Sequence, residues 1–165
     1  MISEATKQRF AREVAKYPAD QKQSAVMACL SIVQQEQGWV SPEAEKDVAD
    51  YLGMPPIAVH EVVTFYNMYN QRPVGKFKFA VCTNLPCQLR GGKDAADHLS
   101  KRLGIELGGT TADGLFSVQE CECLGACADA PVMLVNDRQM CSFMGPERLD
   151  ALVDELAQQA QQGVK

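Results

Sequence analysis

Residues 75–87, which read GKFKFAVCTNLPC, mark the point where the chain changes from helix to sheet. Within them the apolar side chains of Phe77, Phe79 and Val81 alternate with charged or small ones. A period of two is typical of a β-strand with one buried face, whereas the residues before Gly75 follow a helical period. The predicted strand runs directly into a pair of cysteines, so the sequence predicts a cysteine loop at a strand end.

The rest of the C-terminal part continues this pattern. Leu99 and Leu103 predict a helix that ends at Gly104, and a last helix is predicted to begin at Pro146. Further strands are predicted at residues 115–119, 132–135 and 139–143. The order strand, helix, strand, strand, strand, helix is that of a thioredoxin-like core, a mixed sheet with helices packed on it, although other α/β sandwiches share it.

The N-terminal part, residues 1–73, is predicted to be a small helical bundle. Its clearest start signal is residues 41–43 (SPE), where serine can cap a helix, proline occupies the first helical position and a carboxylate meets the helix dipole. Further upstream, one helix is expected to extend to Tyr17 and the next to be capped by Asp20. We therefore predict an α+β chain, with a helical domain at 1–73 and a thioredoxin-like domain at 74–165.

The composition excludes several classes of function. The 165-residue chain has a formal net charge of -5 and no cluster of basic residues, which argues against nucleic acid as a partner. Residues 1–7 lack the features of a secretory signal, and no stretch approaches the roughly 18 to 20 apolar residues that span a bilayer. We therefore expect a cytoplasmic chain without direct membrane insertion. In that compartment its seven cysteines are more often metal ligands or redox groups than disulfides.

Two cysteine pairs follow predicted strands. Four residues separate Cys82 from Cys87, and three separate Cys123 from Cys127. No Cys-x-x-Cys motif occurs, which disfavours a thioredoxin-type dithiol enzyme and departs from the usual spacing of zinc sites. Two separated pairs suit a binuclear 2Fe–2S cluster, in which each iron takes two thiolates. On spacing alone, zinc stays as the alternative metal.

The other cysteines and the histidines are expected to lie outside this ligand set. His60 and His98 fall in helical patterns away from the cysteine loops, whereas a Rieske centre requires two histidine ligands. Cys29, on a helix face, and Cys141, in the predicted hairpin, are interpreted as small core residues. Cys121 is predicted to be a strand residue that packs near the site without being a ligand.

Four segments carry a resemblance to a known family. They are the runs 80–87 (AVCTNLPC), 122–131 (ECLGACADAP), 37–40 (QGWV) and 63–66 (VTFY). With them, the chain resembles the family of thioredoxin-like 2Fe–2S subunits of respiratory complex I, the NADH:quinone oxidoreductase. The resemblance extends from about Tyr17 to about Leu156, and both cysteine motifs match without gaps.

This resemblance implies a site and a function. Cys82, Cys87, Cys123 and Cys127 would be the ligands of one 2Fe–2S cluster, and the chain would be an electron-transfer subunit of NADH:quinone oxidoreductase. FMN and NAD are expected on a partner, the FMN- and NADH-binding subunit, whose flavin exchanges one electron with this cluster. We expect no complete active site on this chain, which has no nucleotide-binding motif. The expected location is the peripheral arm of a complex on the cytoplasmic face of the inner membrane.

The resemblance also implies alternatives. Homologous subunits belong to NAD-dependent formate dehydrogenases and hydrogenases, so either assembly is an alternative to complex I, and a zinc-stabilised binding module is a third reading. The helical domain is interpreted as a docking module with Trp39, Phe65 and Tyr66 as contacts. In the opposite interpretation, these aromatic side chains fill the core of the bundle.

Overall fold

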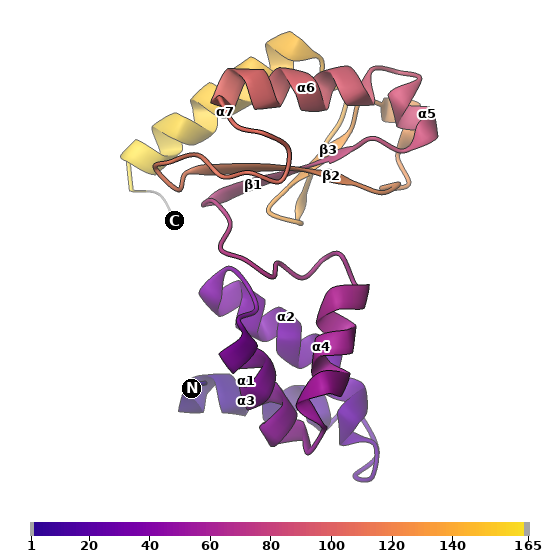
Figure 1. Ribbon diagram of the computed structural model, residues 1–165, viewed down its shortest axis with the longest axis vertical. Coiled ribbons are helices and arrows are strands. Elements are labelled where there is room, and N and C mark those ends of the chain that lie inside the picture. Colours follow the sequence, from indigo (N-terminus) through magenta and orange to yellow (C-terminus); the bar gives the residue numbers. More distant parts are fainter. Residues whose placement is uncertain (1, 164–165) are drawn as a thin grey trace. The chain divides into compact units, whose positions relative to one another are not determined.

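The computed structural model describes residues 2–163, and the chain divides between Pro73 and Val74 into two compact units. The first unit is entirely helical (Figure 1). Its elements are α1 (Glu4–Val14), the 3-10 turn η1 (Lys22–Ala25), α2 (Val26–Gln37), α3 (Pro42–Leu52) and α4 (Pro56–Phe65).

Local sequence signals set the ends of α3. The Ser41 hydroxyl accepts a hydrogen bond from the Ala44 N–H at 3.1 Å, and Pro42 is the first helical residue. At the other end Gly53 adopts φ 67°, a left-handed conformation in which glycine costs less than other residues. The helix start predicted at residues 41–43 is therefore confirmed.

The region between α1 and α2 differs from the prediction. Helix α1 ends at Val14, so Tyr17 lies beyond it with its side chain 40% exposed. Pro18 disfavours helical backbone at the residue before it, which explains why the apolar spacing does not continue the helix. Asp20 does not cap α2, because η1 intervenes and α2 begins at Val26.

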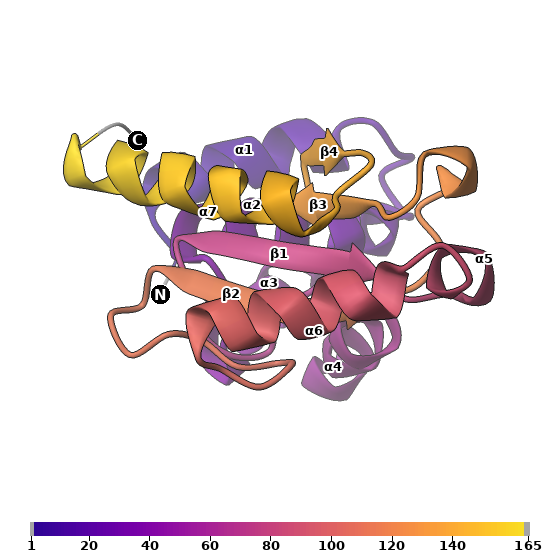
Figure 2. The ribbon, with the colours of Figure 1, turned by 90° about the horizontal axis from the view of Figure 1, so that it is seen from above.

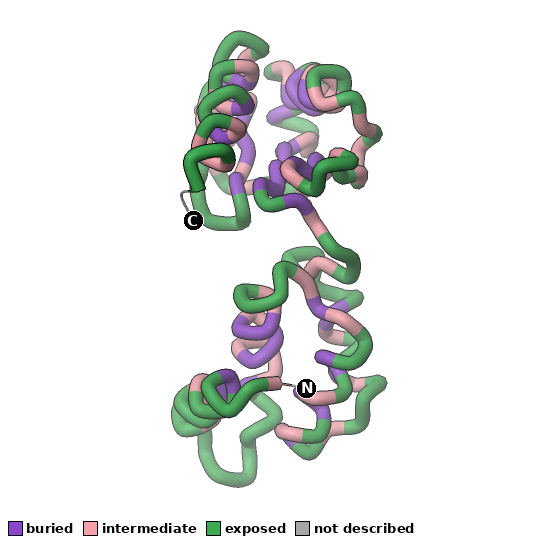
Figure 3. Tube along the Cα trace, turned by 90° about the vertical axis from the view of Figure 1, so that its left-hand side faces the viewer, coloured by how far each residue is buried: buried purple, intermediate pink, exposed green. Residues whose placement is uncertain are grey.

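The helical unit has its own apolar core. Phe10 packs edge-on against Tyr51, with 5.1 Å between ring centroids. The fully buried side chains around it come from α2, α3 and α4 and include Cys29, Leu30, Val33, Val48, Leu52, Val59 and Val63. Figure 3 shows buried segments on the inner faces of these helices. Cys29 is thus a core residue, as expected.

The second unit is a four-stranded mixed sheet with helices α6 and α7 on one face (Figures 1 and 2). Its elements are β1 (Phe77–Cys82), α5 (Leu85–Gln88), α6 (Gly92–Leu103), β2 (Phe116–Cys121), the 3-10 turn η2 (Cys127–Asp129), β3 (Met133–Val135), β4 (Gln139–Cys141) and α7 (Pro146–Gln161). The strand order is β2-β1-β3-β4, with β1 and β2 parallel and the other two pairings antiparallel.

Alternation along β1 separates the two faces of the sheet. Phe77, Phe79 and Val81 belong to the core beneath α6 and α7, and the Phe79 ring stacks on Phe116 with centroids 5.5 Å apart. Lys78 points to the opposite face, where its ammonium group lies 2.6 Å from the Asp137 carboxylate. The predicted α+β, thioredoxin-like order of elements is confirmed.

Candidate functional site

Parallel pairing brings the two cysteine loops to one end of the sheet. Strands β1 and β2 pair in register from Phe77 opposite Phe116 to Cys82 opposite Cys121, so both strands end at the same level. Figure 2 shows α5 and the loop after β2 at this end. Loops at the carboxyl ends of parallel strands are a common location for functional groups.

The first cysteine loop, residues 82–87, is part of the folded core. Cys82 is the last residue of β1 and is fully buried, and Cys87 lies in α5 with only 1% of its surface exposed. Gly92 packs against this loop so closely that a Cβ atom there would lie 2.5 Å from the Cys82 carbonyl oxygen. The same Cβ would lie 3.0 Å from the carbonyl oxygen of Cys87. Only glycine therefore fits beneath the first loop without displacement of the backbone.

The second cysteine loop, residues 123–127, lies at the surface. Cys123 is exposed, Cys127 is half-buried at the start of η2, and their sulfur atoms are 3.7 Å apart. Gly125 adopts φ 75° between them, and its N–H donates to the Cys123 sulfur at 3.4 Å. The backbone thus turns so that two thiols face one point and one of them receives an N–H bond.

A side-chain bond and a backbone bond connect the two loops. The Asn84 Nδ2 group donates to the Glu122 carboxylate at 2.8 Å, and the Thr83 N–H donates to the Cys121 carbonyl at 3.3 Å. Sequence reasoning did not find these contacts or helix α5, which it assigned to a loop. The order Asn84, Leu85, Pro86 is a helix-start signal that would have indicated α5.

The thiols of the two loops influence one another. Burial, and then the adjacent Cys82 and Cys127 thiols, raise the pKa of Cys87 to about 12. Interaction with the Cys123 thiol, followed by burial, raises the pKa of Cys127. The structure therefore brings together the cysteines of both loops, Cys82, Cys87, Cys123 and Cys127. A cationic centre between them would allow all four to be thiolates.

The donor set has the chemistry of an iron–sulfur or zinc site. Four cysteine sulfurs, supplied as two pairs by two loops, match the demand of a 2Fe–2S cluster, in which each iron takes two thiolates. Within residues 2–163, no three His, Cys, Asp or Glu side chains are arranged as ligands of a single metal ion. The residues present fit a binuclear cluster because each loop supplies one pair of cysteine sulfurs, as each iron requires.

The three other cysteines lie apart from this set or at its edge. Burial raises the pKa of Cys29, in the helical core, to about 12. Cys141 is half-buried on β4, and burial also raises its pKa. Cys121, the last residue of β2, is half-buried and packs against Cys82 and its apolar neighbours, as predicted for a strand residue near the site.

Both histidines lie on helices outside the cysteine loops. His60 of α4 contacts the Glu45 carboxylate through Nδ1 at 2.9 Å. His98 of α6 contacts the Asp150 carboxylate of α7 through Nε2 at 2.9 Å. Each imidazole therefore joins two helices, and the expectation that neither belongs to the cysteine site agrees with these positions.

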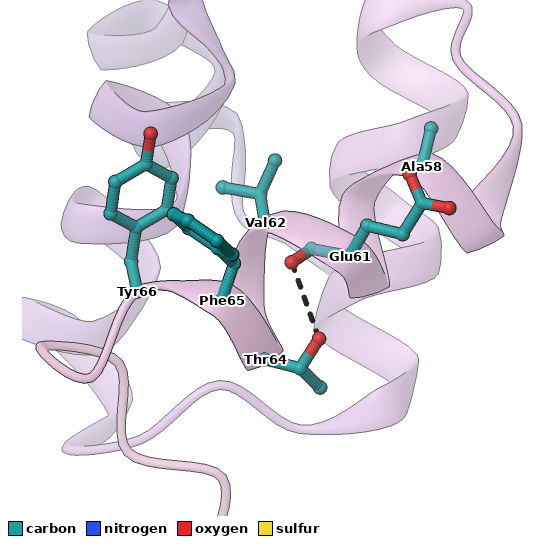
Figure 4. A pocket seen from close by; sticks show the side chains of 6 residues that line it. All are labelled: Ala58, Glu61, Val62, Thr64, Phe65 and Tyr66. Carbon is teal, nitrogen blue, oxygen red and sulfur yellow. Dashed lines mark hydrogen bonds between the residues drawn. The ribbon is translucent and has the colours of Figure 1, made fainter.

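A concave surface lies on the helical unit, at the C-terminal end of α4. It encloses about 620 Å³ and is lined by Ala58, Glu61, Val62, Thr64, Phe65 and Tyr66 (Figure 4). The Phe65 side chain is 80% exposed and that of Tyr66 is 40% exposed, and their rings pack edge-on with centroids 5.1 Å apart. These two rings do not fill the bundle core, whereas Trp39 is half-buried.

Sequence comparison finds a family model and several relatives that match most of this chain. The model of the thioredoxin-like [2Fe-2S] ferredoxin family matches residues 10–157. NADH-quinone oxidoreductase subunit 2 of Thermus thermophilus is 44% identical over 148 residues, which cover 89% of this chain and 82% of the relative. A subunit of the NADH-quinone oxidoreductase of Rickettsia bellii is 42% identical over 144 residues, covering 87% of this chain and 86% of the relative.

A solved structure shows a similar fold. The crystal structure of an NAD+-reducing [NiFe]-hydrogenase in the air-oxidized state matches with a TM-score of 0.70 and 23% identity. The match covers 82% of this chain and 23% of the hydrogenase chain, so this chain corresponds to about a quarter of that one.

Within the described part of the chain, no helix is long and apolar enough to cross a membrane.

Proposed function

Because this chain belongs to the thioredoxin-like [2Fe-2S] ferredoxin family, we propose that it is the electron-transfer subunit of an NADH:quinone oxidoreductase. It carries one 2Fe–2S cluster and is part of the enzyme without containing its complete active site. The single observation that supports this most strongly is the convergence of two cysteine loops at one end of the sheet, where neighbouring thiols help to raise the pKa of Cys87 in the first loop and of Cys127 in the second.

The proposed ligands are Cys82 and Cys87 from the first loop and Cys123 and Cys127 from the second. When bound, the cluster would accept and release one electron, and it would become more negative by one charge on reduction. The buried pair would fix one side of the cluster to the sheet, because β1 and α5 hold both residues. Since Cys123 is exposed, the other side would lie near the surface, where electron exchange with a partner is possible.

Charged groups around the second loop adjust how readily the electron is accepted. The Glu122 carboxylate precedes the first ligand of this loop, and its negative charge opposes reduction. The N–H of Gly125, which donates to the Cys123 sulfur, has the opposite effect because it favours the more negative state. The chain's own contribution to electron transfer is thus to hold four sulfurs and to set their electrostatic surroundings.

The proposed partner is the FMN- and NADH-binding subunit of the same complex, whose flavin would exchange one electron with the cluster. We place the assembly in the peripheral arm of a complex on the cytoplasmic face of the inner membrane. Both assignments follow the family resemblance and the names of the related oxidoreductase subunits in Thermus thermophilus and Rickettsia bellii.

The helical unit, residues 1–73, is proposed to be a docking module. Three of its exposed apolar side chains, those of Phe65, Tyr66 and Met68, lie at the end of α4 or just after it, and Phe65 and Tyr66 border the concave surface in Figure 4. Exposed aromatic side chains beside a hollow are typical contact residues at protein interfaces. Phe65→Ser should weaken co-purification of the flavin-carrying partner, whereas Ile57→Ser, which also changes an exposed side chain on α4, should not.

The test of the cluster assignment is anaerobic purification of the full chain. About two irons and two acid-labile sulfides per chain are expected, with the EPR signal of one spin-half centre after reduction. Serine substitution of any of the four proposed ligands should abolish or distort this signal, whereas Cys29→Ser and Cys141→Ser should leave it unchanged. Zinc without sulfide would contradict the proposal and support the zinc-stabilised module.

The alternative assembly is an NAD-dependent formate dehydrogenase or hydrogenase. The hydrogenase structure is 23% identical to this chain, so it supports a shared fold and does not favour this alternative. Co-purification separates the possibilities, because a quinone-reducing complex brings membrane subunits with it. A molybdenum- or nickel-containing subunit in their place would support the alternative.

A further inference from the structure

Cys121 occupies a special position beside the proposed ligands. The parallel register pairs Cys121 on β2 directly with Cys82 on β1. Register partners on neighbouring strands project from the same face of a sheet, and the strands are about 4.8 Å apart. Cys121 is therefore the side-chain neighbour of a proposed ligand across the sheet, although it lies two positions before Cys123 along the chain.

The surroundings of Cys121 keep it in this position. It is half-buried and packs against the small apolar group around Cys82, Cys87 and Val132. Its carbonyl accepts the Thr83 N–H at 3.3 Å, which extends the β1–β2 pairing one residue beyond the end of β1. A residue at this end of a strand cannot turn its side chain to the other face without loss of the register.

We propose that Cys121 is a positioning residue of the cluster site, whose S–H group, on the same face of the sheet as the Cys82 side chain, raises the reduction potential of the cluster. This inference rests on the proposed function, because it takes Cys82 as a ligand. A thiol that binds no metal keeps its proton at neutral pH and is a weak hydrogen-bond donor. Beside a thiolate, the S–H dipole is attracted to the negative charge, and donors to ligand sulfurs favour the reduced, more negative state.

The experiment compares substitutions that keep or remove the donor. Cys121→Val removes the S–H group with little change in shape, Cys121→Ala removes it and leaves space, and Cys121→Ser replaces it with an O–H donor. Cys141→Val is the matched control, because Cys141 is also a half-buried strand thiol but lies on β4. The measurements on the full, anaerobically purified chain are iron content and the midpoint potential from an EPR-monitored redox titration.

All four variants should keep two irons per chain. The midpoint potential should fall in Cys121→Val and in Cys121→Ala, return towards the wild-type value in Cys121→Ser, and stay unchanged in Cys141→Val. Agreement between the Val and Ala variants separates the lost dipole from altered packing, because the two differ in the volume they fill.

Two results would overturn the inference alone. A wild-type midpoint potential in both Cys121→Val and Cys121→Ala would show that the thiol only fills space. Loss of iron from Cys121→Val and Cys121→Ser, with unchanged circular dichroism, would show that Cys121 is a ligand. Absence of the 2Fe–2S cluster from the wild-type chain is distinguishable from both results, since it would overturn the proposed function together with this inference.

Discussion

The two cysteine loops differ in how the fold holds them. In the first, Cys82 and Cys87 are buried and belong to a strand and a helix. In the second, Cys123 is exposed and Cys127 begins a three-residue 3-10 turn. The fold therefore fixes one pair before any metal is bound, whereas the other pair is held by a short surface loop that the cluster would further restrain.

The largest expected effect comes from Gly92→Ala, because Gly92 packs directly against the buried first loop. The added Cβ would lie 2.5 Å from the Cys82 carbonyl oxygen, so the backbone must move. We expect a loss of about 3 kcal/mol in the free energy of unfolding, the upper part of the range for overpacking, together with loss of the cluster. Chemical denaturation and iron analysis measure the two effects.

Gly145→Ala is the control for this prediction. Gly145 also lies at the start of a helix, but a Cβ there would meet no atom within 4 Å and its φ of -72° suits any residue. Stability and iron content close to wild type are expected. Equal stability of the two alanine variants would show that the first loop can shift to accept the added Cβ at Gly92.

Alanine substitution of one ligand from each loop compares the loops directly. Cys87→Ala and Cys123→Ala should both lose the cluster, because each removes a proposed ligand. In the metal-free chain, Cys87→Ala should lower the free energy of unfolding by about 1 kcal/mol, since it deletes a buried group of methyl size. Cys123→Ala should change it little, because Cys123 is exposed. Denaturation of the metal-free variants measures this difference, and equal losses would contradict the contrast between the loops.

Alkylation of the metal-free chain tests the difference between the two cysteine loops for each thiol separately. Iodoacetamide should modify Cys123 at least about tenfold faster than Cys82 or Cys87, since reagent reaches only exposed sulfur. Cys29, buried in the helical core, is the internal reference for a protected thiol. Peptide mass spectrometry over time gives the rates, and rapid labelling of Cys82 would show that the first loop opens without metal.

The smallest effect is expected from Glu122→Gln. The amide oxygen can still accept the Asn84 bond that joins the loops, so stability and iron content should be unchanged. Removal of one negative charge beside the second loop should raise the midpoint potential, because reduction adds negative charge. An EPR-monitored titration checks the shift, and a lower potential would show that Glu122 acts on the cluster in another way.

Features that depend only on residues close together in the sequence were predictable. The start of α3 at Ser41 and Pro42 and the strand at Phe77 follow from local capping and alternation, and the structure confirms them. Two predicted helix ends were wrong for local reasons. Pro18 disfavours helical backbone at Tyr17, so α1 does not extend to Tyr17, and the η1 turn separates Asp20 from the start of α2.

The site was predictable only in part. The spacing of the cysteines and the family resemblance indicated which thiols to consider. The Asn84–Glu122 bond, the burial of one pair and the position of Cys121 opposite Cys82 depend on the register between two distant strands, which local patterns do not encode.

The parallel pairing of β1 and β2 also sets an order of events during synthesis. Parallel strands require a crossover, and here the whole segment containing α6 must be synthesised before β2 can lie beside β1. Helical bundles, which close mainly local contacts, fold faster than such long-range pairings. A growing chain can therefore complete the helical unit first, while iron and sulfide must wait until the polypeptide beyond Cys127 has emerged and the crossover has closed.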